Sequence, residues 1–150
     1  MAESSRASLT QGDYALIDDC RIVEGKKSME CDFAIERKSL ADFIGTIGTG
    51  WERFKRELDR MKSADFPARI IIVESDFDAC CFWVDDSGNV KPPQYNYSRI
   101  TPPFVIRRIA DLMYNGVCVM FAGNREYAAA LAVKVFQVRL DKLKGIEVGL

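Results

Sequence analysis

The stretch Asp32–Asp42, which reads DFAIERKSLAD, predicts a strand that runs directly into a helix. The residues before Glu36 are typical of a strand, and the apolar residues after Ser39 recur at helical spacing, at Leu40, Phe43, Ile44 and Ile47. Residues i and i+2 of a strand point to the same face, so Glu36 and Lys38 are expected side by side at the strand end. Asp42 follows on the first turns of the helix, which Ser39 or a neighbour would cap.

Two carboxylates and a lysine at one strand-to-helix junction are the groups needed to hold Mg²⁺ and activate water. The alternative interpretation of Glu36, Arg37 and Lys38 is an ordinary cluster of surface ion pairs. Two further features favour a functional site. Gly12-Asp13-Tyr14 opens an earlier strand, and a helix rich in basic residues follows the junction.

The composition is that of an ordinary globular chain and narrows the available chemistry. Its 150 residues fit one domain, and the formal net charge of −1 means that nucleic-acid binding would need a local basic patch. The chain has no histidine, which excludes Ser-His-Asp triads, Cys-His pairs and histidine metal cages. The five cysteines include no Cys-x-x-Cys pair, so we expect reduced, mostly buried thiols and neither a zinc site nor a disulfide framework.

The same composition bears on location. No apolar run approaches the roughly 18 residues of a membrane helix, and no signal peptide opens the chain. We therefore expect no membrane association and a cytoplasmic or otherwise intracellular protein, of bacterial or phage origin if cytoplasmic.

The remaining patterns predict alternating strands and helices. Strands are expected at 13–19, 30–38, 68–74 and 117–121, with a hairpin tip at 24–28 between the first two. Helices are expected at 40–47, 51–63, 76–84, 102–115 and 125–143, and a long loop at 85–101. Residues 1–10 are polar and are expected to be loose. This order predicts an α/β sandwich with a mixed sheet.

Two helices carry surfaces of interest. The helix at 51–63 has an apolar stripe for the core and, on its other faces, the basic residues Arg53, Lys55, Arg56 and Arg60. With Lys26 and Lys27 at the hairpin tip, these residues are either solvated surface or a track for DNA phosphates. The last helix is apolar over a wide arc, which indicates either a partner surface or complete burial.

Several of these residues together resemble a known family. Gly12-Asp13 followed by Glu36-Arg37-Lys38 and Asp42 is similar to the GD…ERKxxxD motif of the XPF-family nuclease domain, within the PD-(D/E)xK nucleases. The segment 50–54 resembles the family's Gly-Arg-Phe helix, and 116–126 is similar to the late strand and helix of small phage and bacterial members. The resemblance covers about residues 11–143 and places one nuclease domain over 11–150. It implies a restriction-endonuclease-like fold, a three-layer sandwich with a central mixed sheet flanked by helices.

The resemblance also implies a function and a site. It implies an endonuclease that hydrolyses phosphodiester bonds of branched or flapped DNA and requires Mg²⁺ or Mn²⁺. Asp13, Glu36 and Asp42 would be the metal ligands, and Lys38 would complete the catalytic set. Arg37, on the opposite strand face, would anchor structure.

One departure from the family supports an alternative. Relatives usually begin with a strand that bears Asp-x-Arg-Glu, which residues 1–10 lack, although Asp18 or Asp19 could compensate. The alternative function is an inactive DNA-binding or scaffold subunit that pairs with an active nuclease. The pairing would be a homodimer or heterodimer through the C-terminal helix.

Overall fold

A parallel sheet of three strands forms the centre of the protein. The computed structural model describes residues 12–60, 68–81, 83–84, 86–88, 90–91 and 100–146. The sheet has the order β3-β4-β7, from β3 (Ala34–Lys38), β4 (Arg69–Val73) and β7 (Val117–Phe121). β4, the central strand, is buried along its whole length, as the apolar run in the sequence predicts.

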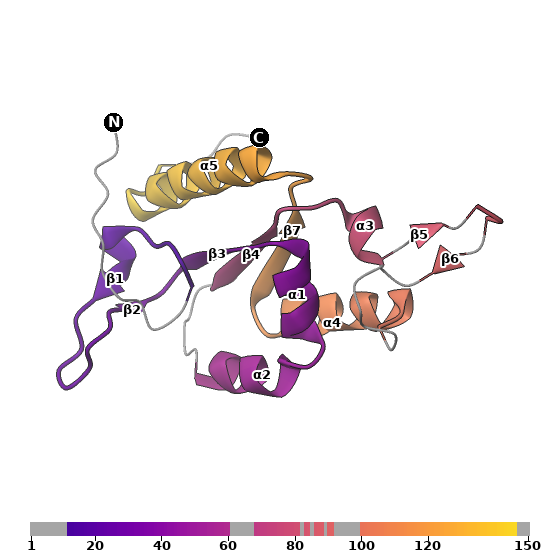
Figure 1. Ribbon diagram of the computed structural model, residues 1–150. Coiled ribbons are helices and arrows are strands. Elements are labelled where there is room, and N and C mark those ends of the chain that lie inside the picture. Colours follow the sequence, from indigo (N-terminus) through magenta and orange to yellow (C-terminus); the bar gives the residue numbers. More distant parts are fainter. Residues whose placement is uncertain are drawn as a thin grey trace.

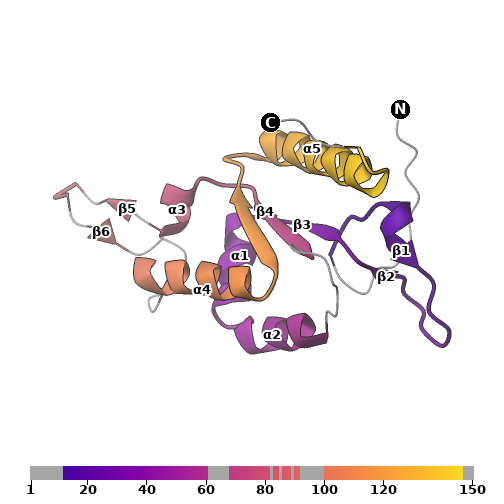
Figure 2. The ribbon, with the colours of Figure 1, turned by 180° about the vertical axis from the view of Figure 1, so that it is seen from behind.

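Helices cover both faces of this sheet (Figures 1 and 2). One layer consists of α1 (Leu40–Ile47), α2 (Trp51–Arg60) and α4 (Pro102–Tyr114), and the other is the long helix α5 (Arg125–Leu143). Each layer has its own hydrophobic core against the sheet. The predicted restriction-endonuclease-like sandwich is therefore confirmed.

Smaller elements extend from the two ends of the sheet (Figure 1). A 3-10 helix, η1 (Ile17–Asp19), leads into an antiparallel pair, β1 (Cys20–Arg21) and β2 (Glu30–Cys31). At the opposite end lie α3 (Phe77–Cys81) and a second antiparallel pair, β5 (Trp83–Val84) and β6 (Val90–Lys91).

Strand alternation sends the side chains of β3 to two different layers. Ile35 is fully buried in the core against α5, whereas Glu36 and Lys38 face the layer of α1 and α2. The parallel register pairs Ala34 with Arg69, so Arg69 lies on the same side of the sheet as Glu36. This register decides which charged groups can meet at the site.

The structure confirms most of the predicted elements. The helix at 40–47, the strand at 117–121 and the helix at 125–143 have the predicted bounds. Ser39 and Asn124 cap their helices, because the side chain of each accepts a hydrogen bond from a backbone N–H three residues later. The predicted helix at 51–63 is described to residue 60, and residues 1–11 and 61–67 lie outside the described residues.

The predicted strand at 13–19 is wrong. Only Tyr14 makes a bridge, antiparallel to Ile35, and the chain then turns into η1. The physical reason is Asp19, a buried carboxylate that accepts three hydrogen bonds from Arg139 of α5. A buried charge needs such a partner, and this pair draws the chain toward α5 instead of along β3.

Other bounds also differ from the prediction. The expected strand at 30–38 is two strands, because β2 pairs with β1 while β3 pairs with β4. The expected helix at 76–84 ends at Cys81, and β5 follows it. The expected loop at 85–101 contains β6, and its residues 92–99 lie outside the described residues.

Gly12 provides the first test of the fold. Its φ of +75° favours glycine, and a Cβ added there would lie 2.7 Å from the Cβ of Ala34. We expect Gly12→Ala to lower the free energy of unfolding by about 1–3 kcal/mol, measured by urea denaturation. Gly25→Ala is the matched control, because its φ is +81° but no atom lies within 4 Å of the added Cβ. Equal losses in the two variants would contradict close packing at Gly12.

Candidate active site

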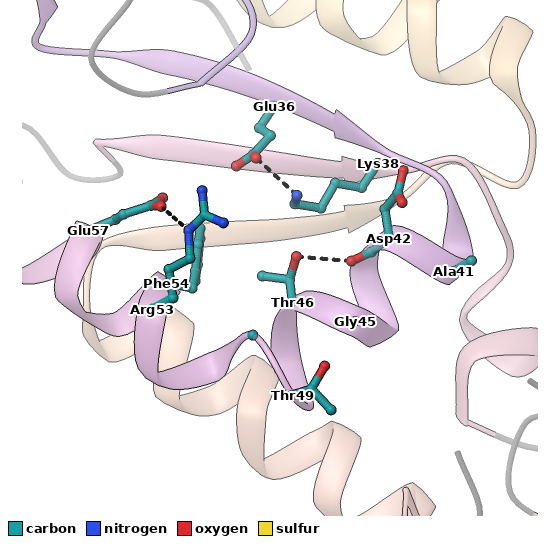
Figure 3. A pocket seen from close by; sticks show the side chains of 11 residues that line it. Glu36, Lys38, Ala41, Asp42, Gly45, Thr46, Thr49, Arg53, Phe54 and Glu57 are labelled. Carbon is teal, nitrogen blue, oxygen red and sulfur yellow. Dashed lines mark hydrogen bonds and ion pairs between the residues drawn. The ribbon is translucent and has the colours of Figure 1, made fainter. Parts of the chain in front are cut away.

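A cleft of about 530 Å³ opens between the end of β3 and the helices α1 and α2 (Figure 3). Polar and charged side chains from all three elements line it. The lining residues are Glu36, Lys38, Ala41, Asp42, Gly45, Thr46, Thr49, Gly50, Arg53, Phe54 and Glu57. Of the four residues that the sequence places in a catalytic set, Glu36, Lys38 and Asp42 are in this lining.

Glu36 and Lys38 form an ion pair across one face of β3. Glu36 Oε1 lies 3.0 Å from Lys38 Nζ, and their side chains are only 17% and 15% exposed. The two residues are neighbours because i and i+2 of a strand share a face, as the sequence predicts. Both extend over the cleft from its strand side (Figure 3).

A buried arginine is the partner of Glu36 that sequence reasoning missed. Arg69, at the start of β4, is 1% exposed, and its Nη1 lies 3.6 Å from Glu36 Oε2. Its guanidinium also lies over the ring of Phe54, 5.4 Å from the ring centroid. Burial lowers the pKa of Arg69, while the charge of Glu36 acts in the opposite direction. A single arginine in an otherwise apolar strand was the signal available in the sequence.

Asp42 enters the cleft from the first turn of α1 (Figure 3). Its backbone N–H donates to Ser39 Oγ at 3.2 Å, and its carbonyl accepts from Thr46 Oγ1 at 2.9 Å. Its side chain is exposed, and a carboxylate is favoured at this position by the helix dipole. The junction thus presents two carboxylates, from Glu36 and Asp42, to one cleft.

Asp13 lies beside the strand and not in the cleft lining. Its Oδ2 accepts a hydrogen bond from the backbone N–H of Arg37 at 3.0 Å. Desolvation raises the pKa of Asp13; the Arg37 hydrogen bond opposes this effect, and the nearby charge of Glu36 adds to it. Asp13 is therefore close enough to Glu36 for their charges to interact.

The side chain of Arg37 lies on the opposite face of β3 from Glu36 and Lys38. Its Nη2 lies 2.9 Å from Glu74 Oε1 and donates to the backbone carbonyl of Arg125 at 3.2 Å. These contacts tie β3 to the first turn of α5. The structural role predicted for Arg37 agrees with this position.

The predicted DNA-binding residues fall into two groups. Arg53 lines the cleft and pairs with Glu57 at 3.5 Å, and Lys55 and Arg56 are exposed on the same helix. Lys26 and Lys27 are exposed in the hairpin segment between β1 and β2, away from the cleft lining, and Lys26 pairs with Glu30. The side chain of Arg60 lies outside the described part of the chain.

Comparison with known proteins places the chain in a family. The ERCC4 domain matches residues 2–135 of the 150. The chain belongs to the ERCC4 domain family. The resemblance to the XPF-family nuclease domain is thereby confirmed. No curated protein matches the chain.

The ERCC4 family is one of structure-specific nucleases that act on DNA and generally depend on a divalent metal. Within the described ranges, no helix of this ERCC4 domain is long and apolar enough to cross a membrane. The family assignment, by itself, points to DNA as the partner.

The residues of the cleft fit a hard divalent cation held by few protein ligands. Among the described residues, no group of three or more Asp, Glu, Cys or His side chains is placed to hold a metal ion. Asp13, Glu36 and Asp42 therefore do not converge as a ready-made set. Mg²⁺, however, commonly binds through one or two carboxylates and keeps several waters. Glu36 Oε2 is buried and accepts no hydrogen bond from the described residues, but it lies 3.6 Å from Arg69 Nη1, so an ion would have to take this oxygen from the arginine.

The raised pKa of Asp13 gives a test of its placement. The folded protein binds the proton of the Asp13 carboxyl group more tightly than the unfolded chain does. Protonation of Asp13 therefore stabilises the fold, and this stabilisation is complete below the ordinary pKa of aspartate. It is lost as the pH rises through the raised value. At pH 7 and without metal, we expect Asp13→Asn to raise the free energy of unfolding slightly, with a smaller effect near pH 4. Urea denaturation at both pH values measures the difference.

Asp18→Asn, which removes one carboxylate charge at an exposed position in η1, is the control for the change in net charge. A loss of stability in Asp13→Asn at pH 7 would show that the ionised carboxylate stabilises the fold, contrary to this account.

Proposed function

We propose that this ERCC4 domain is a divalent-metal-dependent DNA endonuclease that hydrolyses phosphodiester bonds in branched or flapped DNA. The observation that carries the proposal is the pairing of Glu36 with Lys38 in a cleft that Asp42 also enters. This arrangement supplies oxygen ligands and an adjacent ammonium group at a strand-to-helix junction. The family assignment supports DNA as the substrate.

Each residue of the junction has a distinct role in the proposal. Glu36 and Asp42, with Asp13, would hold Mg²⁺ or Mn²⁺. A bound divalent cation lowers the pKa of water and offsets negative charge at the phosphate. Lys38 is within 3.0 Å of Glu36, and its ammonium would orient the attacking water or stabilise charge that develops on the phosphate oxygens.

Arg53, Lys55 and Arg56 would hold DNA at the edge of the cleft. All three are exposed on α2, and Arg53 also lines the cleft. Because the net charge of the chain is −1, attraction for DNA must come from such a local patch. We include Arg60, Lys26 and Lys27 among the residues that bind DNA phosphates. The two lysines would contact DNA that extends beyond the cleft.

One observation favours a second candidate function, an inactive DNA-binding subunit that pairs with an active nuclease. The described residues contain no group of three potential ligands. α5 carries two large exposed apolar side chains, Tyr127 and Val133, that a partner could cover. The two candidates differ in cleavage, since an inactive subunit would bind flapped DNA without cutting it.

The cleavage assay is the main test of the proposed function. The full chain is incubated with flap, fork and duplex DNA in Mg²⁺ or Mn²⁺ and in EDTA. We expect metal-dependent cleavage of flap or fork DNA, and a loss of about 100-fold or more in Lys38→Met and Asp42→Asn. Glu36→Gln should lose as much, but its folding must be checked because Arg69 would lose its buried partner.

Glu24→Gln and Lys134→Met, at exposed positions in the hairpin and on α5, are the matched controls and should cleave like the unmodified chain. Cleavage that persists in EDTA, or in Lys38→Met, would contradict the proposed chemistry. Binding without cleavage at any concentration of either metal would favour the inactive subunit instead.

A binding measurement tests the role of α2. In a Lys38→Met background, which should not cut DNA, we expect Arg53→Ala and Arg56→Ala each to weaken flap binding several-fold at physiological salt. Each should also reduce the slope of log Kd against log salt by about 1. Fluorescence anisotropy measures both. Lys134→Ala on α5, in the opposite layer, should leave both values unchanged; an equal effect there would show that α2 is not the binding surface.

A further inference from the structure

Two cysteines face each other across the hairpin of β1 and β2. Cys20 and Cys31 are direct cross-strand partners, and their Sγ atoms lie 3.1 Å apart. That separation is only about 1 Å longer than a disulfide bond. The two cysteines are eleven positions apart and no sequence motif pairs them, which is why the sequence predicts reduced thiols and no disulfide framework.

The register of the hairpin suits a cross-link between them. The backbone N–H of Asp32 donates to the carbonyl of Asp19, which makes Cys20 and Cys31 a non-hydrogen-bonded pair of the antiparallel ladder. Such pairs have Cα atoms roughly 4.5 Å apart, the closer of the two spacings in antiparallel strands. This spacing falls within the range of about 4.4–6.8 Å that disulfides span.

The two thiols differ in access to solvent. Cys20 is half-buried, whereas Cys31 is buried, and burial together with the hydrogen bond to Cys20 raises the pKa of Cys31 to about 12. A thiol must ionise to act as a nucleophile. Cys20 is therefore the thiol that meets a reagent from solvent, and Cys31 is the thiol that resolves the product.

We propose that Cys20 and Cys31 form a modification site for small-molecule disulfides such as oxidised glutathione, which convert the pair into an intramolecular disulfide. The Cys20 thiolate attacks one sulfur of oxidised glutathione, so that a mixed disulfide forms and one glutathione leaves and takes up a proton. Cys31 then loses its proton and attacks Cys20 Sγ, which expels the second glutathione as a thiolate that takes up the proton. The protein dithiol is oxidised, and oxidised glutathione is reduced to two molecules of glutathione.

The cross-link would restrict the segment that joins Asp13 to Glu36. Residues 14–35 lie between these two carboxylates, and they include η1, β1 and β2. Closing the loop between Cys20 and Cys31 removes conformational freedom from the unfolded chain. The inference does not depend on nuclease activity, because it concerns the hairpin and not the cleft.

Peptide mapping of the full chain tests the site. The protein is equilibrated with oxidised glutathione, its remaining thiols are alkylated, and its peptides are analysed by mass spectrometry with and without reductant. We expect a reversible Cys20–Cys31 cross-link, and Cys118, which lies apart from this pair on β7, should take no part in it. The oxidised form should melt roughly 5–10 °C higher than the reduced form.

Cys20→Ser is the matched variant and should form no cross-link and show no rise in melting temperature with oxidant. Should this variant fail to fold, the mapping of the unmodified chain still decides. Two results would overturn the proposal: alkylation of both cysteines after oxidation, or a glutathione adduct that remains on Cys20.

Discussion

The pairing of Glu36 with two cations is the interaction on which the site depends. Arg69 is almost completely buried, and a buried guanidinium is tolerated only where a carboxylate compensates it. Glu36 does so with one oxygen and contacts Lys38 with the other. Glu36 therefore contributes to the fold as well as to the cleft. A cation bound there would meet the positive charges of Lys38 and Arg69, which oppose its binding.

The parallel sheet determines which residues reach the cleft. β3 directs Ile35 toward α5 and Glu36 with Lys38 toward α1 and α2. Because the strand ends where α1 begins, Asp42 on the first helical turn enters the same space. The buried pair Asp19–Arg139 diverts the preceding segment toward α5, so the sheet gains a single antiparallel bridge, at Tyr14, on its β3 edge. Two features therefore place the side chains of the site: the alternation of side chains along β3, and the start of α1 directly after this strand.

Patterns within a few residues of sequence predicted the features that depend only on neighbouring residues. The cap at Ser39, the bounds of α1 and the neighbourhood of Glu36 and Lys38 follow from spacing within a few residues. The contacts that sequence reasoning missed join distant segments. Arg69 reaches Glu36 through strand register, and Asp19 reaches Arg139 across 120 positions. No short-range pattern encodes such pairs, and the wrong strand prediction at 13–19 has this origin.

The most direct measurement is diffraction at the manganese absorption edge from crystals of the full chain soaked in Mn²⁺. The account predicts one anomalous peak in the cleft, about 2.0–2.6 Å from carboxylate oxygens of at least two of Asp13, Glu36 and Asp42. It also predicts that Glu36 turns an oxygen from its present partners toward the ion. A cleft without a peak, in which Glu36 still contacts both Lys38 and Arg69, would contradict it.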